Sequence, residues 1–221
     1  MSNYKLLIFD WDGTLMDSAA RIVSSMQNAA TELQLPIPDE QSIRNIIGLS
    51  LGIAIDQIVP NISAADNKRL CAGYSDHYRE FDQTPTPLYK GVEESMFRLK
   101  DKGYTLAVAT GKSRKGLDRV LANTGFDKIV TVSRGADETK SKPDPLMLEE
   151  ILHATQFSAS QALMIGDTSY DLEMAQNLNM PSIGVSYGMH SIGVLKQYKP
   201  VFIADKFQSI EQWLDANGES K

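Results

Sequence analysis

The stretch LLIFDWDGTL, residues 6–15, joins a short apolar run to two carboxylates. The apolar part, residues 6–9, shows no polar alternation and stops at Asp10. That pattern is typical of a strand buried on both faces, as in a parallel sheet. We therefore expect Asp10 and Asp12 to stand at the carboxyl end of a central strand.

Two later apolar runs have the same character, and each stops at polar or small residues. Residues 105–109 lead into Thr110-Gly111, and residues 162–165 lead into Gly166-Asp167. Weaker strand candidates cover residues 129–132, 182–185 and 201–203. Helical patterns alternate with these runs, over residues 93–102, 114–124, 145–155, 170–178 and 210–216. This alternation predicts an α/β fold with a doubly wound, Rossmann-like parallel sheet.

Residues 17–88 break the alternation. Their apolar residues recur at helical spacing, and proline or glycine separates the segments 18–35, 39–47, 50–58 and 63–81. Residues 84–89, TPTPLY, carry two prolines and should be extended. The sequence thus predicts an α/β core of residues 1–16 and 89–221, interrupted by an all-helical domain of residues 17–88.

Composition restricts the classes of partner. The chain has 221 residues, with 22 basic and 28 acidic side chains and a formal net charge of −6, which disfavours nucleic-acid binding. Its single cysteine, Cys71, excludes a disulfide framework and a cysteine-based zinc site. No apolar run suits a membrane span or a secretory signal. We expect a cytoplasmic monomer or dimer with neither nucleic-acid nor membrane partners.

The polar residues at the strand ends should meet in space. Ligands of doubly wound sheets bind beyond the carboxyl ends of the strands, so Asp10, Thr110 and Asp167 are expected to converge. Asp12 and Asp171 would lie close by, and four carboxylates in one cleft repel each other. A divalent cation relieves this repulsion, and an all-oxygen site suits Mg²⁺.

The same edge of the sheet should accept a phosphate group. Thr110-Gly111 offers a hydroxyl and backbone amides just before a helix N-terminus, which is a ready anion site. Lys142, in SKPDP, would supply a balancing positive charge. The side chain of Lys112 could either contact the phosphate or face solvent, and the sequence does not decide between the two. Arg114 and Lys115 are expected at the surface.

Four motifs then reveal a resemblance. They are DWDGTL at 10–15, ATG at 109–111, KP at 142–143 and GDTSYD at 166–171. In their order and spacing the chain resembles haloacid dehalogenase-superfamily hydrolases of subfamily IA, the phosphoglycolate phosphatase-like branch. The resemblance covers essentially the whole chain, because the helical insert falls where that branch carries its cap.

The resemblance implies a role for each motif residue. Asp10 would be the nucleophile that forms an aspartyl-phosphate, and Asp12 the general acid and base. Phosphate would be held by Gly13, Thr110, Gly111 and Lys142. Mg²⁺ would be bound by Asp10, Asp167 and the backbone carbonyl of Asp12. Asp171 would bind it directly or through water.

The implied function is a Mg²⁺-dependent phosphatase for a small phosphorylated metabolite. Candidate substrates are phosphoglycolate-like esters, sugar phosphates and nucleotides. Leu49 and Ser50, in the glycine-flanked segment 48–52, are candidates for substrate selection, although an ordinary turn between helices explains them equally well. A substrate contact by His190 is also left open. The alternatives are a phosphomutase of the β-phosphoglucomutase type and a non-catalytic binding module on the same fold.

Overall fold

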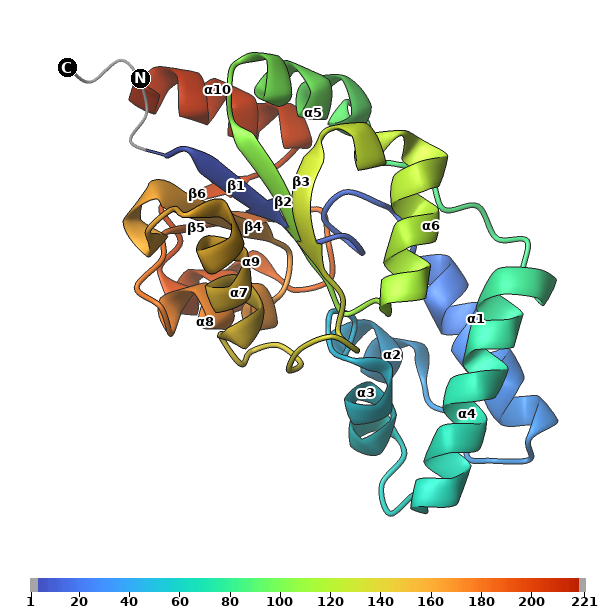
Figure 1. Ribbon diagram of the computed structural model, residues 1–221. Helices are drawn as coiled ribbons and strands as arrows, with labels where there is room; N and C mark the ends of the chain where they lie inside the picture. The colour runs from blue at the N-terminus through green and yellow to red at the C-terminus, as the bar shows by residue number, and fades with distance from the viewer. Residues whose placement is uncertain (1–3, 219–221) are drawn as a thin grey trace.

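The sheet of the protein confirms the predicted fold class. The computed structural model describes residues 4–218, so residues 1–3 and 219–221, the ends of the predicted core, lie outside the described residues. Six parallel strands stand in the order β3-β2-β1-β4-β5-β6 (Figure 1). They are β1 Leu6–Phe9, β2 Thr105–Ala109, β3 Val130–Arg134, β4 Ala162–Gly166, β5 Ser182–Val185 and β6 Phe202–Ala204. This is the doubly wound order whose direction reverses between β1 and β4, where ligands bind.

The side chains of β1 explain its unbroken apolar sequence. Leu7 and Phe9 belong to one hydrophobic cluster, while Leu6 and Ile8 belong to a second. Because alternate side chains of a strand point to opposite faces, these two clusters cover the two faces of the sheet. Hydrogen-bonded neighbours on both sides, β2 and β4, complete the burial of β1. Asp10 therefore follows a strand that is packed on both faces and hydrogen-bonded along both edges.

Helices cover both faces of the sheet. The cluster around Phe9 includes residues of α5 Val92–Asp101, α6 Arg114–Thr124 and α10 Phe207–Gly218. The opposite cluster includes residues of α7 Leu146–Thr155 and α8 Ser169–Gln176. The short helix α9 Ile192–Leu195 and the 3₁₀ turns Phe126–Lys128, Ala159–Gln161 and Lys196–Tyr198 were not predicted. Elements this short carry too few apolar residues to show a helical period.

Residues 17–88 are helical, as predicted. The helices are α1 Ala19–Glu32, α2 Glu40–Asn45, α3 Leu51–Ile58 and α4 Ala64–Asp76, followed by a π-helical turn, η1 His77–Phe81. They share an apolar cluster of their own, and in Figure 1 α1–α4 gather at one end of the molecule. We call these helices the cap. The predicted boundaries, after residues 16 and 88, stay a prediction.

The two segments that join core and cap run side by side. Met16 and Leu88 form an antiparallel bridge. The Asp17 amide donates to the Pro87 carbonyl at 2.8 Å, and the Tyr89 amide donates to the Leu15 carbonyl at 3.0 Å. The chain thus leaves the core and returns to it at one place, close to the carboxyl end of β1.

Candidate active site

Three aspartates meet at the reversal point of the sheet. Asp10 follows β1, Asp167 follows β4, and Asp171 lies in the first turn of α8. All three are buried, and one carboxylate oxygen from each lies within 4.8 Å of the other two. We call these residues the acidic triad. Two members follow neighbouring strands and the third lies at the start of a helix. Asp10 and Asp171 are 161 residues apart in the sequence.

Lys142 neutralises part of this charge. Its Nζ lies 2.6 Å from Asp10 Oδ1 and 2.6 Å from Asp171 Oδ1, and the side chain is buried. Burial works against the charged ammonium, but the carboxylates of Asp10 and Asp171 prevail and raise the pKa of Lys142 above its ordinary value. The lysine is therefore held as a cation beside two members of the triad.

One oxygen of Asp10 has no such partner. Among residues 4–218, Asp10 Oδ2 is buried without a hydrogen-bond donor. Burial raises the pKa of Asp10 well above its ordinary value, and the Lys142 ammonium opposes that shift. Buried polar atoms are nearly always paired, so an unpaired carboxylate oxygen points to a missing ligand.

Asp167 is held in place from two sides. Its Oδ1 accepts a hydrogen bond from Thr14 Oγ1 at 2.8 Å, and its Oδ2 accepts one from the Met189 amide at 2.8 Å. Burial, followed by repulsion from Asp171, raises its pKa to about 7. Gly13, at φ +90°, packs so closely that a Cβ there would clash with the Asp167 carboxylate.

The triad fits a divalent cation. Its three carboxylates face a single buried ammonium, Asp10 Oδ2 is unpaired, and desolvation disfavours the ionised form of Asp10 and Asp167. A hard cation bound by carboxylate oxygens would remove all three difficulties. The residues that could hold it are Asp10, Asp167 and Asp171.

Asp12 lies apart from the triad. Its Oδ1 accepts a hydrogen bond from Ser18 Oγ at 2.5 Å and lies 2.9 Å from Lys112 Nζ. Lys112 is thus turned inward, with only 11% of its side chain exposed, against the solvent-facing alternative, while a phosphate contact by Lys112 stays a prediction. The carboxylate of Asp12 is not part of the metal-ligand cluster, and a role for its backbone carbonyl stays a prediction.

Thr110 and Gly111 stand at the end of β2. Thr110 is buried, and its Oγ1 accepts a hydrogen bond from the Lys112 amide at 3.2 Å. A Cβ on Gly111 would lie 2.6 Å from the carbonyl oxygens of both Gly48 and Leu49. Only glycine allows the cap to approach this closely, so the segment between α2 and α3 rests directly on the loop that follows β2.

Further contacts hold the cap against the core. The Ser50 amide donates to Ser141 Oγ at 2.9 Å, one residue before Lys142. The Asn45 carbonyl accepts from Tyr170 Oη at 3.0 Å and lies 3.2 Å from His190 Nε2. Since the Ser169 amide donates to His190 Nδ1 at 2.9 Å, the ring proton belongs on Nε2, which donates to Asn45. The structure therefore places His190 in a cap–core contact.

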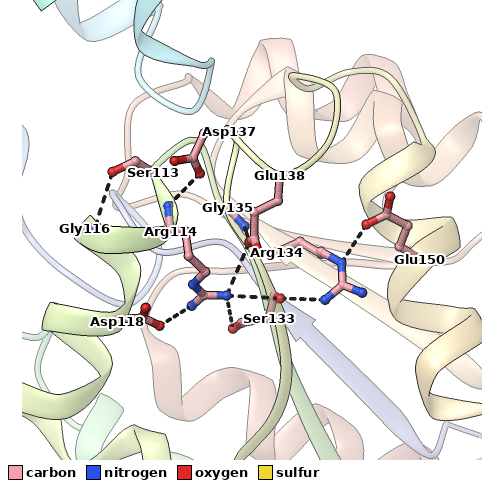
Figure 2. Close-up of polar contacts among 10 residues, drawn as sticks. All are labelled: Ser113, Arg114, Gly116, Asp118, Ser133, Arg134, Gly135, Asp137, Glu138 and Glu150. Carbon is pink, nitrogen blue, oxygen red and sulfur yellow. Dashed lines mark hydrogen bonds and ion pairs between the residues drawn. The ribbon is translucent and has the colours of Figure 1, made fainter.

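A polar network holds the loop that follows β3, as Figure 2 shows. Further along the chain the same loop leads to Lys142. The Arg114 amide donates to Asp137 Oδ1 at 2.6 Å, and its Nη1 donates to Ser133 Oγ at 3.0 Å. The Gly135 amide donates to Glu138 Oε2 at 2.8 Å. Contrary to the sequence prediction, Arg114 is half-buried, because it ties the start of α6 to β3 and to this loop. Contacts of this kind depend on side chains distant in sequence and leave no local pattern.

A cavity of about 450 Å³ opens beside Asp12. It lies between α1, α3, α4 and the segment that joins α2 to α3 on one side and the start of α6 on the other. Gly48, Leu49, Gly111 and Lys112 line it together with Asp12. The candidate site thus continues from the strand ends into a space between cap and core.

Comparison with known sequences identifies the family. A family model described as "Haloacid dehalogenase-like hydrolase" matches residues 7–185, which include all four motifs. The chain belongs to the haloacid dehalogenase-like hydrolases. The predicted resemblance and the prediction of a hydrolase of this family are thereby confirmed.

Relatives of this hydrolase match it over nearly their whole length. A protein of Dickeya dadantii named "Probable phosphatase IndB" is 36% identical over 211 residues, covering 93% of this chain and 91% of its own. A protein of Vibrio vulnificus named phosphoglycolate phosphatase is 31% identical over 219 residues, covering 96% and 95%.

Solved structures share the architecture. A crystal structure of a "predicted phosphoglycolate phosphatase" from Haemophilus somnus gives a TM-score of 0.84 at 26% identity, covering 96% of this chain and 99% of the other. A "predicted phosphatase" from Clostridium acetobutylicum gives 0.86 at 26% identity, with coverage of 96% and 99%. Within residues 4–218, no helix has the length and apolar character to cross a bilayer. The cytoplasmic location and the oligomeric state stay predictions.

Proposed function

We propose that this hydrolase is a Mg²⁺-dependent phosphatase that cleaves a small phosphomonoester through an aspartyl-phosphate on Asp10. The observation that carries the proposal is Asp10 Oδ2, a buried carboxylate oxygen that has no hydrogen-bond partner among residues 4–218. It stands at the reversal point of the sheet, with a buried lysine on the other oxygen of the same carboxylate. Phosphoryl transfer requires a well-positioned nucleophile and neutralisation of negative charge. A buried carboxylate paired with a lysine meets both requirements.

In the first half-reaction a carboxylate oxygen of Asp10 attacks phosphorus. A new phosphorus–oxygen bond forms to Asp10 while the bond to the alcohol oxygen breaks. Asp12 gives its proton to the departing alcohol, and Ser18 and Lys112 hold the Asp12 carboxylate toward the cavity where the alcohol would lie. Thr110 and the backbone of Gly111 would bind the phosphoryl oxygens.

In the second half-reaction water replaces the alcohol. Asp12, now ionised, takes a proton from a water molecule as that water attacks phosphorus. The bond between phosphorus and Asp10 breaks, inorganic phosphate leaves, and Asp10 recovers its carboxylate. Lys142 stays paired with Asp10 and balances negative charge throughout.

Asp10, Asp167 and Asp171 would hold the Mg²⁺ ion. When bound, the ion would supply positive charge to the phosphoryl oxygens and keep the carboxylates ionised. The relatives named phosphatase support the reaction class, since they match this chain over nine-tenths of their length.

Phosphate release from a panel of small phosphomonoesters tests the proposal. We expect release with Mg²⁺, none with EDTA, and a loss of about a thousandfold or more in Asp10→Asn. Asp17→Asn is the matched control, because Asp17 is an exposed aspartate seven residues along the chain. Folded protein that releases no phosphate from any ester in Mg²⁺ would overturn the proposal, as would an Asp10→Asn variant of normal activity.

A further inference from the structure

The cavity beside Asp12 lies where the alcohol part of a substrate must go. Asp12 lines the cavity, whereas Asp10, Asp167 and Asp171 do not. If Asp12 gives a proton to the departing oxygen, the group attached to that oxygen extends from Asp12 into this space. Gly111 in contact with the carbonyls of Gly48 and Leu49 shows that cap and core are closed upon each other, so the volume is that of the closed site.

The volume is large for a two-carbon acid. Glycolate has five non-hydrogen atoms, and at roughly 30 Å³ each, the share of a water molecule, they fill about 150 Å³. The cavity measures about 450 Å³, about three times as much. A pocket that matches its ligand leaves little empty space, which favours an alcohol of ring size.

The two walls of the cavity differ in chemistry. The cap side is mainly aliphatic, with Ile22 and Met26 of α1, Ile47 of the segment between α2 and α3, and Leu51 of α3. Tyr74, Ser75, Tyr78 and Arg79 also line the cap side. A carboxylate or a sugar hydroxyl placed against the aliphatic side chains, however, would lose its hydration without gaining a hydrogen bond. An apolar face of a ring would be stabilised there.

The opposite wall carries cations. Lys112, Lys115 and Arg119 line it from the start of α6. Within the part of the chain that the structure describes, no ion pair is recorded for Lys115 or Arg119. Arg119 already contacts an aromatic ring, with its guanidinium carbon 6.0 Å from the Tyr78 ring centroid. A guanidinium stacks on π-systems and attracts their faces, which a saturated ring does not offer.

We propose that the preferred substrates are phosphomonoesters whose alcohol carries a flat aromatic ring, nucleobases included, held between the aliphatic wall and the α6 cations. This proposal rests on the phosphatase function proposed above. It assigns Leu51 and Arg119 as specificity-determining residues, on opposite sides of the ring.

Three esters of primary alcohols test the proposal with the Mg²⁺-loaded full chain. They are benzyl phosphate, cyclohexylmethyl phosphate and 2-phosphoglycolate. We expect kcat/KM for benzyl phosphate to exceed that for 2-phosphoglycolate by about tenfold or more. It should exceed that for cyclohexylmethyl phosphate by about threefold, because only the aromatic ring has a π face.

A rate for 2-phosphoglycolate that equals or exceeds the benzyl rate overturns the inference and leaves the phosphatase function standing. Release from none of the three, while another ester of the panel is cleaved, also overturns the inference; folded protein that cleaves no ester at all refutes the phosphatase function itself.

Variants locate the effect in the cavity. Leu51→Trp should lower kcat/KM for benzyl phosphate about tenfold while leaving 2-phosphoglycolate within about twofold. Ile53→Trp is the matched control on the same helix, since Ile53 is 45% exposed and does not line the cavity. Arg119→Leu should bring the ratio of kcat/KM for benzyl phosphate to that for cyclohexylmethyl phosphate close to one.

Equal losses of kcat/KM on all three esters in folded Leu51→Trp would contradict the assignment. If that variant does not fold, Ser75→Trp narrows the same cavity from α4.

Discussion

The strand ends of the core and the inner side of the cap contribute to the site in different ways. The core supplies Asp10, Asp167 and Lys142 as buried charged side chains. The cap meets the core through backbone atoms, such as the Asn45 carbonyl and the Ser50 amide, and lines the cavity mainly with aliphatic side chains. The charged groups of the candidate site therefore lie in the core, whereas the cap supplies most of the apolar lining of the cavity.

The difference has a physical origin. A charged side chain in a buried site must be positioned within tenths of an ångström, and a parallel sheet paired on both sides provides that rigidity. Closure through backbone hydrogen bonds does not depend on which side chain the cap carries at that position. Cap side chains other than those that touch charged groups of the core, as the Tyr78 ring touches Lys112, can therefore change without disturbing these groups.

The largest expected effect falls on the one core carboxylate that faces the cavity. Asp12→Asn removes the proton that the alcohol needs, so kcat should fall by about 10²–10⁴ for an alkyl phosphate. For p-nitrophenyl phosphate, whose leaving group needs little protonation, the loss should be much smaller. Steady-state kinetics on both esters measure the contrast, and equal losses on the two would refute the role of Asp12 as a general acid.

Replacement of the buried Lys142 tests how much its positive charge stabilises the core. Lys142→Met leaves Asp10 and Asp171 without their shared partner, so the free energy of unfolding in EDTA should fall by about 3 kcal/mol. Mg²⁺ should recover part of this loss, because it supplies positive charge at the same carboxylates. Urea unfolding with and without Mg²⁺ measures both values. Lys140→Met, on an exposed side chain two residues earlier, should cost less than about 1 kcal/mol.

The acidic triad should make the metal-free core lose stability as the pH rises from about 4 to about 7. Burial raises the pKa of Asp167 from 3.8 to about 7. The stability contributed by its protonated form is complete below pH 3.8 and is lost as the pH rises through about 7. The slope cannot exceed about 1.4 kcal/mol per pH unit for one group. Thermal unfolding in EDTA between pH 5 and pH 8 should show the decline, and saturating Mg²⁺ should remove it. A metal-free protein that gains stability over this range would contradict the assignment.

The smallest effect belongs to the contact between cap and core. Tyr170→Phe removes one of two donors to the Asn45 carbonyl, and His190 retains the other. A single hydrogen bond contributes about 1 kcal/mol, so KM should rise up to about fivefold while kcat stays unchanged. A large fall in kcat would show that the cap takes part in the chemistry and would contradict a reaction carried out by core residues alone.

The sequence predicts the core better than the cap for the same physical reason. The strands that carry Asp10, Thr110 and Asp167 are buried on both faces, so their unbroken apolar runs mark where each polar residue emerges. The convergence of Asp10, Asp167 and Lys142 follows from that geometry and from the motifs. The contact of Asp12 with Lys112 and that of Asn45 with His190 depend on how two separate parts of the chain close together. The spacing of residues within a single segment does not predict such contacts between distant segments.

The most direct test is to identify the residue that carries the phosphoryl group during turnover. Wild-type protein is mixed with benzyl phosphate and Mg²⁺, quenched in acid within one turnover, reduced with borohydride, digested and mapped by mass spectrometry. We expect a reduced aspartyl residue at Asp10 and none at Asp12, Asp167 or Asp171. A label on any other residue, or none while phosphate is released in a burst, would contradict a core nucleophile at the end of β1.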